Sequence, residues 1–186
     1  MGFYQFVYLF FVYSFLGWLG EVIVTAVRRH RYQDRGVLNG PLCIVYGVGG
    51  LTVNFALGDL QESWVFLFGL SAIYATVLEW VAGHLLERIS GTRWWDYSKD
   101  WLNLDGYICL WASLLWGALS VITIKWGNPL LLMLFRLIPV SVRVVLLWVL
   151  LVIFAIDAIG TVLTMLGLRY RWPPAEAVEN LSLIHI

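Results

Sequence analysis

Charged side chains are scarce in this sequence. They make up 13% of the 186 residues, whereas 61% of the residues are hydrophobic. A soluble domain has roughly a quarter charged and about half apolar residues. Several apolar runs reach the roughly 18 residues that a membrane-spanning helix needs. The composition therefore excludes an ordinary soluble domain and predicts an integral membrane protein.

Other absences narrow the function. The formal net charge is zero, so a nucleic-acid partner has no electrostatic support. The two cysteines, Cys43 and Cys109, allow no disulfide framework; they form either a thiol pair at one membrane face or two small buried residues. The sequence contains no G-x-x-x-x-G-K-[ST], H-E-x-x-H or C-x-x-C motif. We therefore expect no ATP hydrolysis through a P-loop and no cofactor in this chain, and the motifs assign no metal site.

The two ends of the chain are treated separately. The N-terminus has neither the basic segment nor the cleavage site of a signal peptide, so we expect the first apolar segment to remain. At the other end, "LSLIHI" (Leu181–Ile186) resembles the translation of a transposon end used in sequencing libraries, and we treat it as non-native. The expected organisation is one membrane domain over residues 1–172 with a tail over residues 173–180.

Apolar segments along the chain predict an all-α bundle of about five transmembrane helices. The segments are Phe3–Val27, Pro41–Leu57, Trp64–Leu86, Gly106–Trp126 and Val140–Leu168. Between the last two lies the apolar run Pro129–Pro139. At 1.5 Å per residue this run reaches about 15 Å, against roughly 30 Å of hydrocarbon. We therefore predict a short interfacial or re-entrant helix there.

Basic residues predict the orientation of these spans. Five spans place nine arginines and lysines on one side of the membrane and three on the other. Because basic residues gather on the cytoplasmic side, the N-terminus is expected outside and the C-terminus inside.

Three acids interrupt the apolar spans: Glu21, Glu79 and Asp157. In the expected orientation all three lie in the inner half of the membrane, on helices that run in the same direction. An acidic residue at the centre of a membrane helix costs about 2.5–3.5 kcal/mol on insertion scales, so such residues usually face a bundle interior or a wet cavity. Two interpretations stay open: a shared polar cavity, or protonated acids that hydrogen-bond neighbouring helices.

Polar motifs lie at the same face. Asn39, Gly40 and Cys43 precede the second span, and the fourth span begins with a similar set, Asn103, Gly106 and Cys109. Each set follows a helix that carries a glutamate, Glu21 or Glu79. The similarity of the two sets has two explanations, a duplicated two-helix unit or chance. Between the third and fourth spans lies "TRWWDYS" (Thr92–Ser98), whose aromatic residues suit the headgroup boundary and whose Arg93 suits anionic lipid. Arg93 and Asp96 could also pair or cap the entrance of a cavity.

The ordered set "GWLGE", "NGPLCIVYG", "LEW", "RWWDYS" and "LNLDGYICL" resembles a family of small bacterial membrane proteins, the ABC-transporter permeases of type IV or CmpB-like type. The resemblance covers about Phe11–Leu110. It implies a transporter permease subunit in the bacterial inner membrane, with ATP supplied through a separate nucleotide-binding subunit. With the acids it directs attention to a candidate polar cavity of Glu21, Glu79, Asp157, Asn39, Asn103 and Tyr46. It also directs attention to an inner-face motif of Gly40, Pro41, Cys43, Arg93, Trp94, Trp95, Asp96, Tyr97, Gly106 and Cys109.

Three classes of function are consistent with these residues. The first is a permease subunit whose carboxylates bind a proton, a cation or a cationic substrate. The second is a membrane enzyme that acts on a lipid or headgroup, and the third is a noncatalytic assembly subunit. The resemblance favours the first class. The expected partners are the lipid bilayer, a separate nucleotide-binding subunit and a second copy of the chain.

Overall fold

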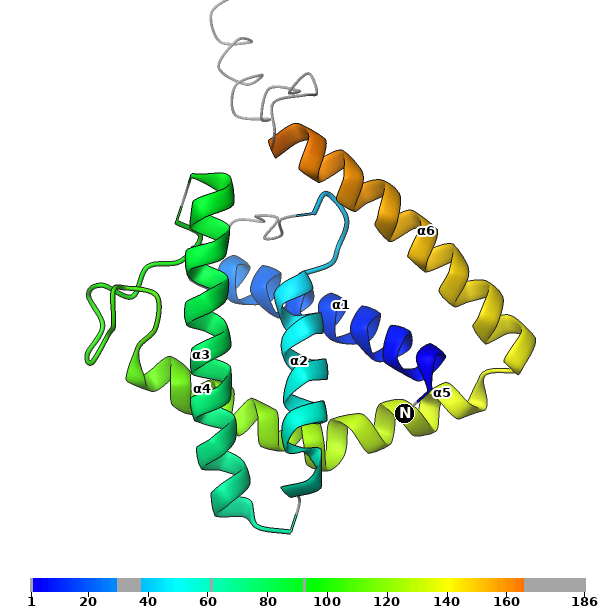
Figure 1. Ribbon diagram of the computed structural model, residues 1–186, viewed down its shortest axis with the longest axis horizontal. Helices are drawn as coiled ribbons and strands as arrows, with labels where there is room; N and C mark the ends of the chain where they lie inside the picture. Colours follow the sequence, from blue (N-terminus) through cyan, green and yellow to red (C-terminus); the bar gives the residue numbers. More distant parts are fainter. Residues whose placement is uncertain (1, 30–37, 61, 92, 166–186) are drawn as a thin grey trace, which may run out of the picture.

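The computed structural model describes residues 2–29, 38–60, 62–91 and 93–165, and these residues form helices with no named strand (Figure 1). The all-α prediction is confirmed. The elements, in chain order, are α1 (Phe3–Arg29), α2 (Ile44–Leu57), the 3-10 turn η1 (Gly58–Leu60), α3 (Trp64–Ser90), α4 (Leu110–Ile122), the π-helical turn η2 (Thr123–Gly127), α5 (Asn128–Leu137) and α6 (Val140–Met165). The tail at residues 173–180, the segment Leu181–Ile186 and several of the basic residues behind the orientation prediction lie outside the described residues.

Within the part of the chain that the structure describes, four helices are long and apolar enough to cross a membrane. They are Phe3–Val27, Trp64–Ile89, Leu110–Leu137 and Val140–Thr164. The remaining predicted span corresponds to α2, which has only 14 residues. At 1.5 Å per residue α2 is about 21 Å long, shorter than the roughly 30 Å of hydrocarbon. The chain is thus a multi-pass membrane protein with four long helices and one shorter apolar helix.

The short helix expected at Pro129–Pro139 is present as α5, but it does not stand alone. It continues α4 through η2, so that Leu110–Leu137 is one helical run of 28 residues. The π-helical turn precedes Asn128, which accepts a hydrogen bond from Tyr13 of α1 and donates one to Asn54 of α2. The proline at position 129 has no N–H to continue the hydrogen-bond ladder of this run, and the π-helical turn directly before it is the local irregularity at that point.

Glycines bring α1 and α2 into close contact. A Cβ atom added at Gly17 would lie 2.2 Å from Cγ of Tyr46, and one added at Gly47 would lie 2.1 Å from Oγ of Ser14. Small residues at such positions are typical of membrane helices, because they let two backbones approach without a hydrophobic driving force. Gly49 has nothing within 4 Å of such a Cβ, so only part of the glycine-rich run serves this contact.

Two apolar clusters complete the packing. Val53 of α2, Leu67 of α3 and Ile124 of η2 belong to one cluster. Phe11 of α1 and Leu147 of α6 belong to the other. Apart from this second cluster and the buried Gly160 and Thr161, most of α6 is exposed, and Figure 1 shows it at the edge of the fold with α1 between it and α2. Its apolar surface suits contact with lipid.

The first turn of α3 and η2 share an aromatic cluster of a kind typical of a membrane boundary, and a boundary here would leave α5 beyond the crossing part of Leu110–Leu137. The rings of Trp64 and Trp126 are 5.4 Å apart, and Nζ of Lys125 lies 4.1 Å from the centre of the Trp64 ring. Tryptophan and lysine together are characteristic of the headgroup region. This cluster therefore provides a reference for depth along α3.

The contact between Gly17 and Tyr46 predicts an asymmetry between two glycines of α1. Gly17→Ala should lower the melting temperature of the detergent-solubilised protein, because overpacking typically costs about 1–3 kcal/mol. Gly20→Ala is the matched control, since a Cβ there meets nothing within 4 Å and alanine favours the helix by roughly 0.5–1 kcal/mol. Equal melting temperatures for the two variants would contradict the proposed close packing.

Candidate functional site

Glu21 and Tyr46 form the first half of a polar cluster. Glu21 follows Gly17 by one helical turn on α1, so the two positions share a face. The ring of Tyr46, in the first turn of α2, packs against Gly17, and its hydroxyl donates to Oε1 of Glu21 at 2.5 Å. The glycine makes room for the ring, and the ring delivers a donor to an acid in an apolar helix.

Glu79 and its neighbours form the second half. The hydroxyl of Tyr97 donates to Oε1 of Glu79 at 3.3 Å. The indole of Trp116, on α4, interacts with the same carboxylate. Oε2 of Glu79 is nevertheless buried and receives no hydrogen bond of good geometry from any described residue. Glu79 is therefore the less satisfied of the two acids.

The two halves meet between α1, α2, α3 and α4. The Tyr46 and Trp116 rings stand edge to face at 5.4 Å, and the charge of Glu21 acts on both Glu79 and Tyr97. We call these five residues the inner acidic cluster. Neither acid forms an ion pair within the described part of the chain.

Asp157 is held elsewhere, on α6. Its Oδ1 accepts hydrogen bonds from the backbone N–H and the side-chain amide of Asn39, at 3.1 and 2.8 Å. Its Oδ2 accepts the backbone N–H of Gly40 at 2.9 Å, and Asn39 also donates to Thr161 at 3.1 Å. We call this arrangement the α6 latch. The structure thus links Glu21 and Glu79 through the neighbouring rings of Tyr46 and Trp116, and it ties Asp157 to the segment that leads into α2.

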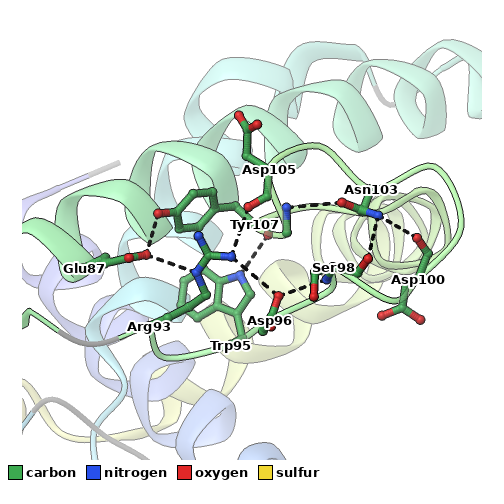
Figure 2. A network of polar contacts seen from close by, with 10 residues as sticks. Glu87, Arg93, Trp95, Asp96, Ser98, Asp100, Asn103, Asp105 and Tyr107 are labelled. Carbon is green, nitrogen blue, oxygen red and sulfur yellow. Dashed lines mark hydrogen bonds and ion pairs between the residues drawn. The ribbon is translucent and has the colours of Figure 1, made fainter.

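The segment between α3 and α4 forms a separate polar network (Figure 2). Arg93 donates to Oε2 of Glu87 at 3.2 Å and to the carbonyl of Asp105 at 3.1 Å, and it lies 3.5 Å from Oδ1 of Asp96. Its guanidinium also lies 4.3 Å from the centre of the Tyr107 ring. Arg93 is thus engaged by protein groups on several sides.

Asn103 belongs to this network and not to the inner acidic cluster. Its side chain donates to the carbonyls of Ser98 and Asp100 and accepts the N–H of Gly106. The turn that it braces has positive φ angles at Leu102, Asp105 and Gly106. Such angles are costly for the two residues other than glycine, so the side-chain bonds of Asn103 hold the turn in shape.

Charged groups in this segment have shifted pKa values. The backbone N–H of Ser98 donates to Asp96 and lowers the pKa of that carboxyl, and the nearby Arg93 acts in the same direction. The hydrogen bond to Glu87 raises the pKa of the Tyr107 hydroxyl, because it stabilises the protonated phenol. At neutral pH, Asp96 is therefore ionised and Tyr107 protonated, which are the forms in which these hydrogen bonds stabilise the network.

The remaining residues of the inner-face motif have structural positions. Cys43 and Cys109 precede the first residues of α2 and α4; Cys43 donates its N–H to the carbonyl of Ser14, and Cys109 is buried. Trp95 donates to the carbonyl of Tyr107 at 2.8 Å. Trp94 is half-buried and Pro41 is exposed.

Glu87, Tyr107 and Trp116 are the interacting residues that sequence reasoning missed. A spacing signal existed for the first two. Gly83 and Glu87 repeat the Gly-x-x-x-Glu pattern of Gly17 and Glu21. Tyr107 packs on Gly83 and donates to Glu87, as Tyr46 does at the other pair. By geometry the counterpart of Glu21 is therefore Glu87, whereas the suspected repeat aligned Glu21 with Glu79.

Within the described ranges, no three His, Cys, Asp or Glu side chains gather where they could hold a metal ion. Among the described residues, the groups that interact with the carboxylates of Glu21 and Glu79 include the hydroxyls of Tyr46 and Tyr97 and the indole of Trp116.

The comparisons with known proteins give one match. A family model described as "Putative ABC-transporter type IV" matches residues 8–162. That range includes the inner acidic cluster, the α6 latch and the Arg93 network. No curated protein and no solved structure matches the chain.

The α6 latch leads to a prediction about Asp157. Asp157→Asn should destabilise the segment before α2, because one carboxylate oxygen becomes an N–H₂ that faces the donors of Asn39 or Gly40. We expect faster hydrogen exchange at the amides of Asn39 and Gly40 and a lower melting temperature, by an amount corresponding to about 1–3 kcal/mol. Thr164→Val is the control, since Thr164 bonds only to the Gly160 carbonyl of its own helix among the contacts described. Unchanged exchange in Asp157→Asn would refute the latch.

Proposed function

The chain belongs to the "Putative ABC-transporter type IV" family, and from that membership we propose that it is the membrane-embedded permease subunit of a transporter, with the inner acidic cluster as its functional centre. The observation that carries this proposal is the pairing of Glu21 and Glu79 from two spanning helices without an ion-pair partner in the described chain. Ionisable groups in membrane helices are costly and usually serve a transported ion, a proton or a substrate.

The cluster's chemistry limits what it handles. Tyr46 and Tyr97 donate to the carboxylates and hold them in position. Both of these donors are neutral, and no ion-pair partner of the two acids lies among the described residues, which favours a proton, a cation or a cationic group of the substrate as the balancing charge. We therefore propose that the pair exchanges a positive charge during the transport cycle.

Energy must come from another polypeptide if ATP drives the cycle. The sequence contains no phosphate-binding loop. The described segments between the helices are also too short to form a nucleotide-binding domain. We propose a separate ATPase subunit as partner, and a second copy of the chain or another membrane subunit to complete a conduit.

The orientation in the bacterial plasma membrane follows the basic residues. We take α2 and η1 together (Ile44–Leu60) as a short second crossing, which makes five passes with nine of twelve arginines and lysines on one side. We therefore propose that the N-terminus lies outside and the segment between α3 and α4 lies at the cytoplasmic face.

This orientation is testable with single cysteines. Lys99→Cys should react with a membrane-impermeant maleimide only in inside-out vesicles, and Glu62→Cys only in intact spheroplasts. Both positions are exposed, so access does not depend on opening the fold. The parent for both variants is Cys43→Ser with Cys109→Ala. Labelling of Lys99→Cys from outside would reverse the assignment.

The test of the function combines partner capture with charge removal. A tagged chain captured from cross-linked native membranes should bring down an ATPase subunit and show ATP hydrolysis. Glu21→Gln and Glu79→Gln should keep the partner but lower the transport-coupled ATPase rate at least tenfold, because glutamine preserves shape and hydrogen bonding while it removes the ionisable group. Their double variant should be no worse than either alone, since both act on one centre.

Glu62→Gln is the control for these variants, because it removes the same group from an exposed turn. A chain that captures no ATPase under cross-linking would contradict the permease proposal. Full activity in the double glutamine variant would identify the two acids as packing residues of a noncatalytic subunit.

A further inference from the structure

The segment Arg93–Ser98, which we call the strap, runs along α3 in a regular register. Arg93 contacts Glu87 at 3.2 Å, and Tyr97 contacts Glu79 at 3.3 Å. Between them, the ring of Trp95 lies 3.2 Å from where a Cβ on Gly83 would be. Alternate strap residues therefore meet every fourth residue of α3.

This register has a simple geometric reason. Two residues of non-helical, extended chain cover about 6.6 Å, and four residues of α-helix cover about 6 Å. The strap can therefore descend along α3 with one side chain per helical turn. The intervening residues Asp96 and Ser98 are exposed, and Trp94 is half-buried.

The register carries the strap into the membrane. If Trp64 marks the outer boundary, roughly 30 Å of hydrocarbon takes about 20 residues of α3 and ends near Gly83. Arg93 then lies at headgroup level, Trp95 at the boundary, and Tyr97 about one turn inside. Non-helical backbone at such depth is tolerated only where protein or water satisfies it. The N–H of Tyr97 accordingly donates to the carbonyl of Gly106 at 2.8 Å.

In the proposed orientation, the strap lies on the cytoplasmic side of Glu79. The Tyr97 hydroxyl occupies Oε1 of Glu79, and Oε2 is buried. A group that reaches Oε1 from that side would have to displace Tyr97.

Arg93 fixes the end of the strap that lies nearest the cytoplasmic headgroups. Its contacts with Glu87, Asp96 and the carbonyl of Asp105 all lie at the headgroup level. The side chains of Arg93 and Glu87 are 34% and 37% exposed, and ion pairs with this exposure are individually weak because water screens them. A fastening of this kind holds the strap at rest and releases it at low cost.

We propose that Arg93–Ser98 is a re-entrant gate that closes the cytoplasmic access to Glu79, and that the ion pair between Arg93 and Glu87 holds the gate shut. The inference rests on the proposed function in naming Glu79 as the group that is shielded and in taking the segment between α3 and α4 as cytoplasmic. Opening separates Tyr97 from Glu79 and lets water and a cation or proton reach the cluster. The strap therefore regulates access to the site.

Cys109 is a natural reporter of this opening. It is 1% exposed and lies close enough to Tyr97 and Glu79 to interact electrostatically with both. In a Cys43→Ser background in nanodiscs, a polar maleimide should label Cys109 slowly. Arg93→Gln and Glu87→Gln should each raise the labelling rate about tenfold, because labelling follows the population of the locally opened form. Arg93→Lys should give a smaller increase, since lysine keeps the charge without the forked geometry.

Lys99→Gln is the matched control, because it removes the same charge from the same segment outside the strap and should leave the rate unchanged. A variant is compared with the parent only if it elutes at the parent's volume in size-exclusion chromatography, which shows that it is folded. One folded variant, either Arg93→Gln or Glu87→Gln, is enough for the test. A parental labelling rate in a folded Arg93→Gln or Glu87→Gln protein would overturn the gate, as would an equal increase in Lys99→Gln. The labelling experiment requires neither transport nor an ATPase partner. Failure to capture an ATPase would therefore contradict the permease proposal without changing the outcome of this test.

Discussion

A tyrosine ring placed on a glycine is the contact on which this fold depends. Tyr46 lies on Gly17 and reaches Glu21, and Tyr107 lies on Gly83 and reaches Glu87. In each case the glycine and the glutamate are one helical turn apart, so one aromatic side chain fills the gap and satisfies the acid. The first contact joins α1 to α2, and the second joins α3 to the segment before α4. Helix association in lipid lacks a hydrophobic driving force, which makes such combined packing and hydrogen bonding effective.

The three intramembrane acids are accommodated in different ways. Asp157 receives backbone and amide donors and is fully engaged. Glu21 receives a tyrosine hydroxyl, and Glu79 receives a longer one and keeps a buried oxygen without a good donor. The satisfied aspartate acts as an attachment for α6. The under-satisfied glutamate, next to a second acid, is the position where exchange of a charge gains most.

The contacts of Arg93, just beyond the end of α3, are individually weak. The Arg93 network is built from groups that are roughly one third to one half exposed, so its bonds are weak one by one. The turn behind it is braced by Asn103 and includes two non-glycine residues with positive φ. A braced turn beside a weakly fastened strap is the arrangement that the proposed gate needs, next to the site that we propose as a transport centre.

The sequence pattern alone was sufficient for the membrane class, the all-α bundle and the positions of the helices, because these depend on composition and on the length of apolar runs. It also identified Glu21, Glu79 and Asp157, because a charge in an apolar run is conspicuous. The sequence pattern did not reveal which residues contact these acids. Asp157 meets Asn39 across 118 positions, and Tyr97 meets Glu79 only because the strap folds back along α3. The continuity of α4 with α5 was equally hidden, since a proline such as Pro129 commonly interrupts a helix, whereas here the π-helical turn before it carries the helical run on. Local patterns report periodicity and burial, whereas partners are chosen by how helices cross and where the connecting segments run, and only the packed chain contains that information.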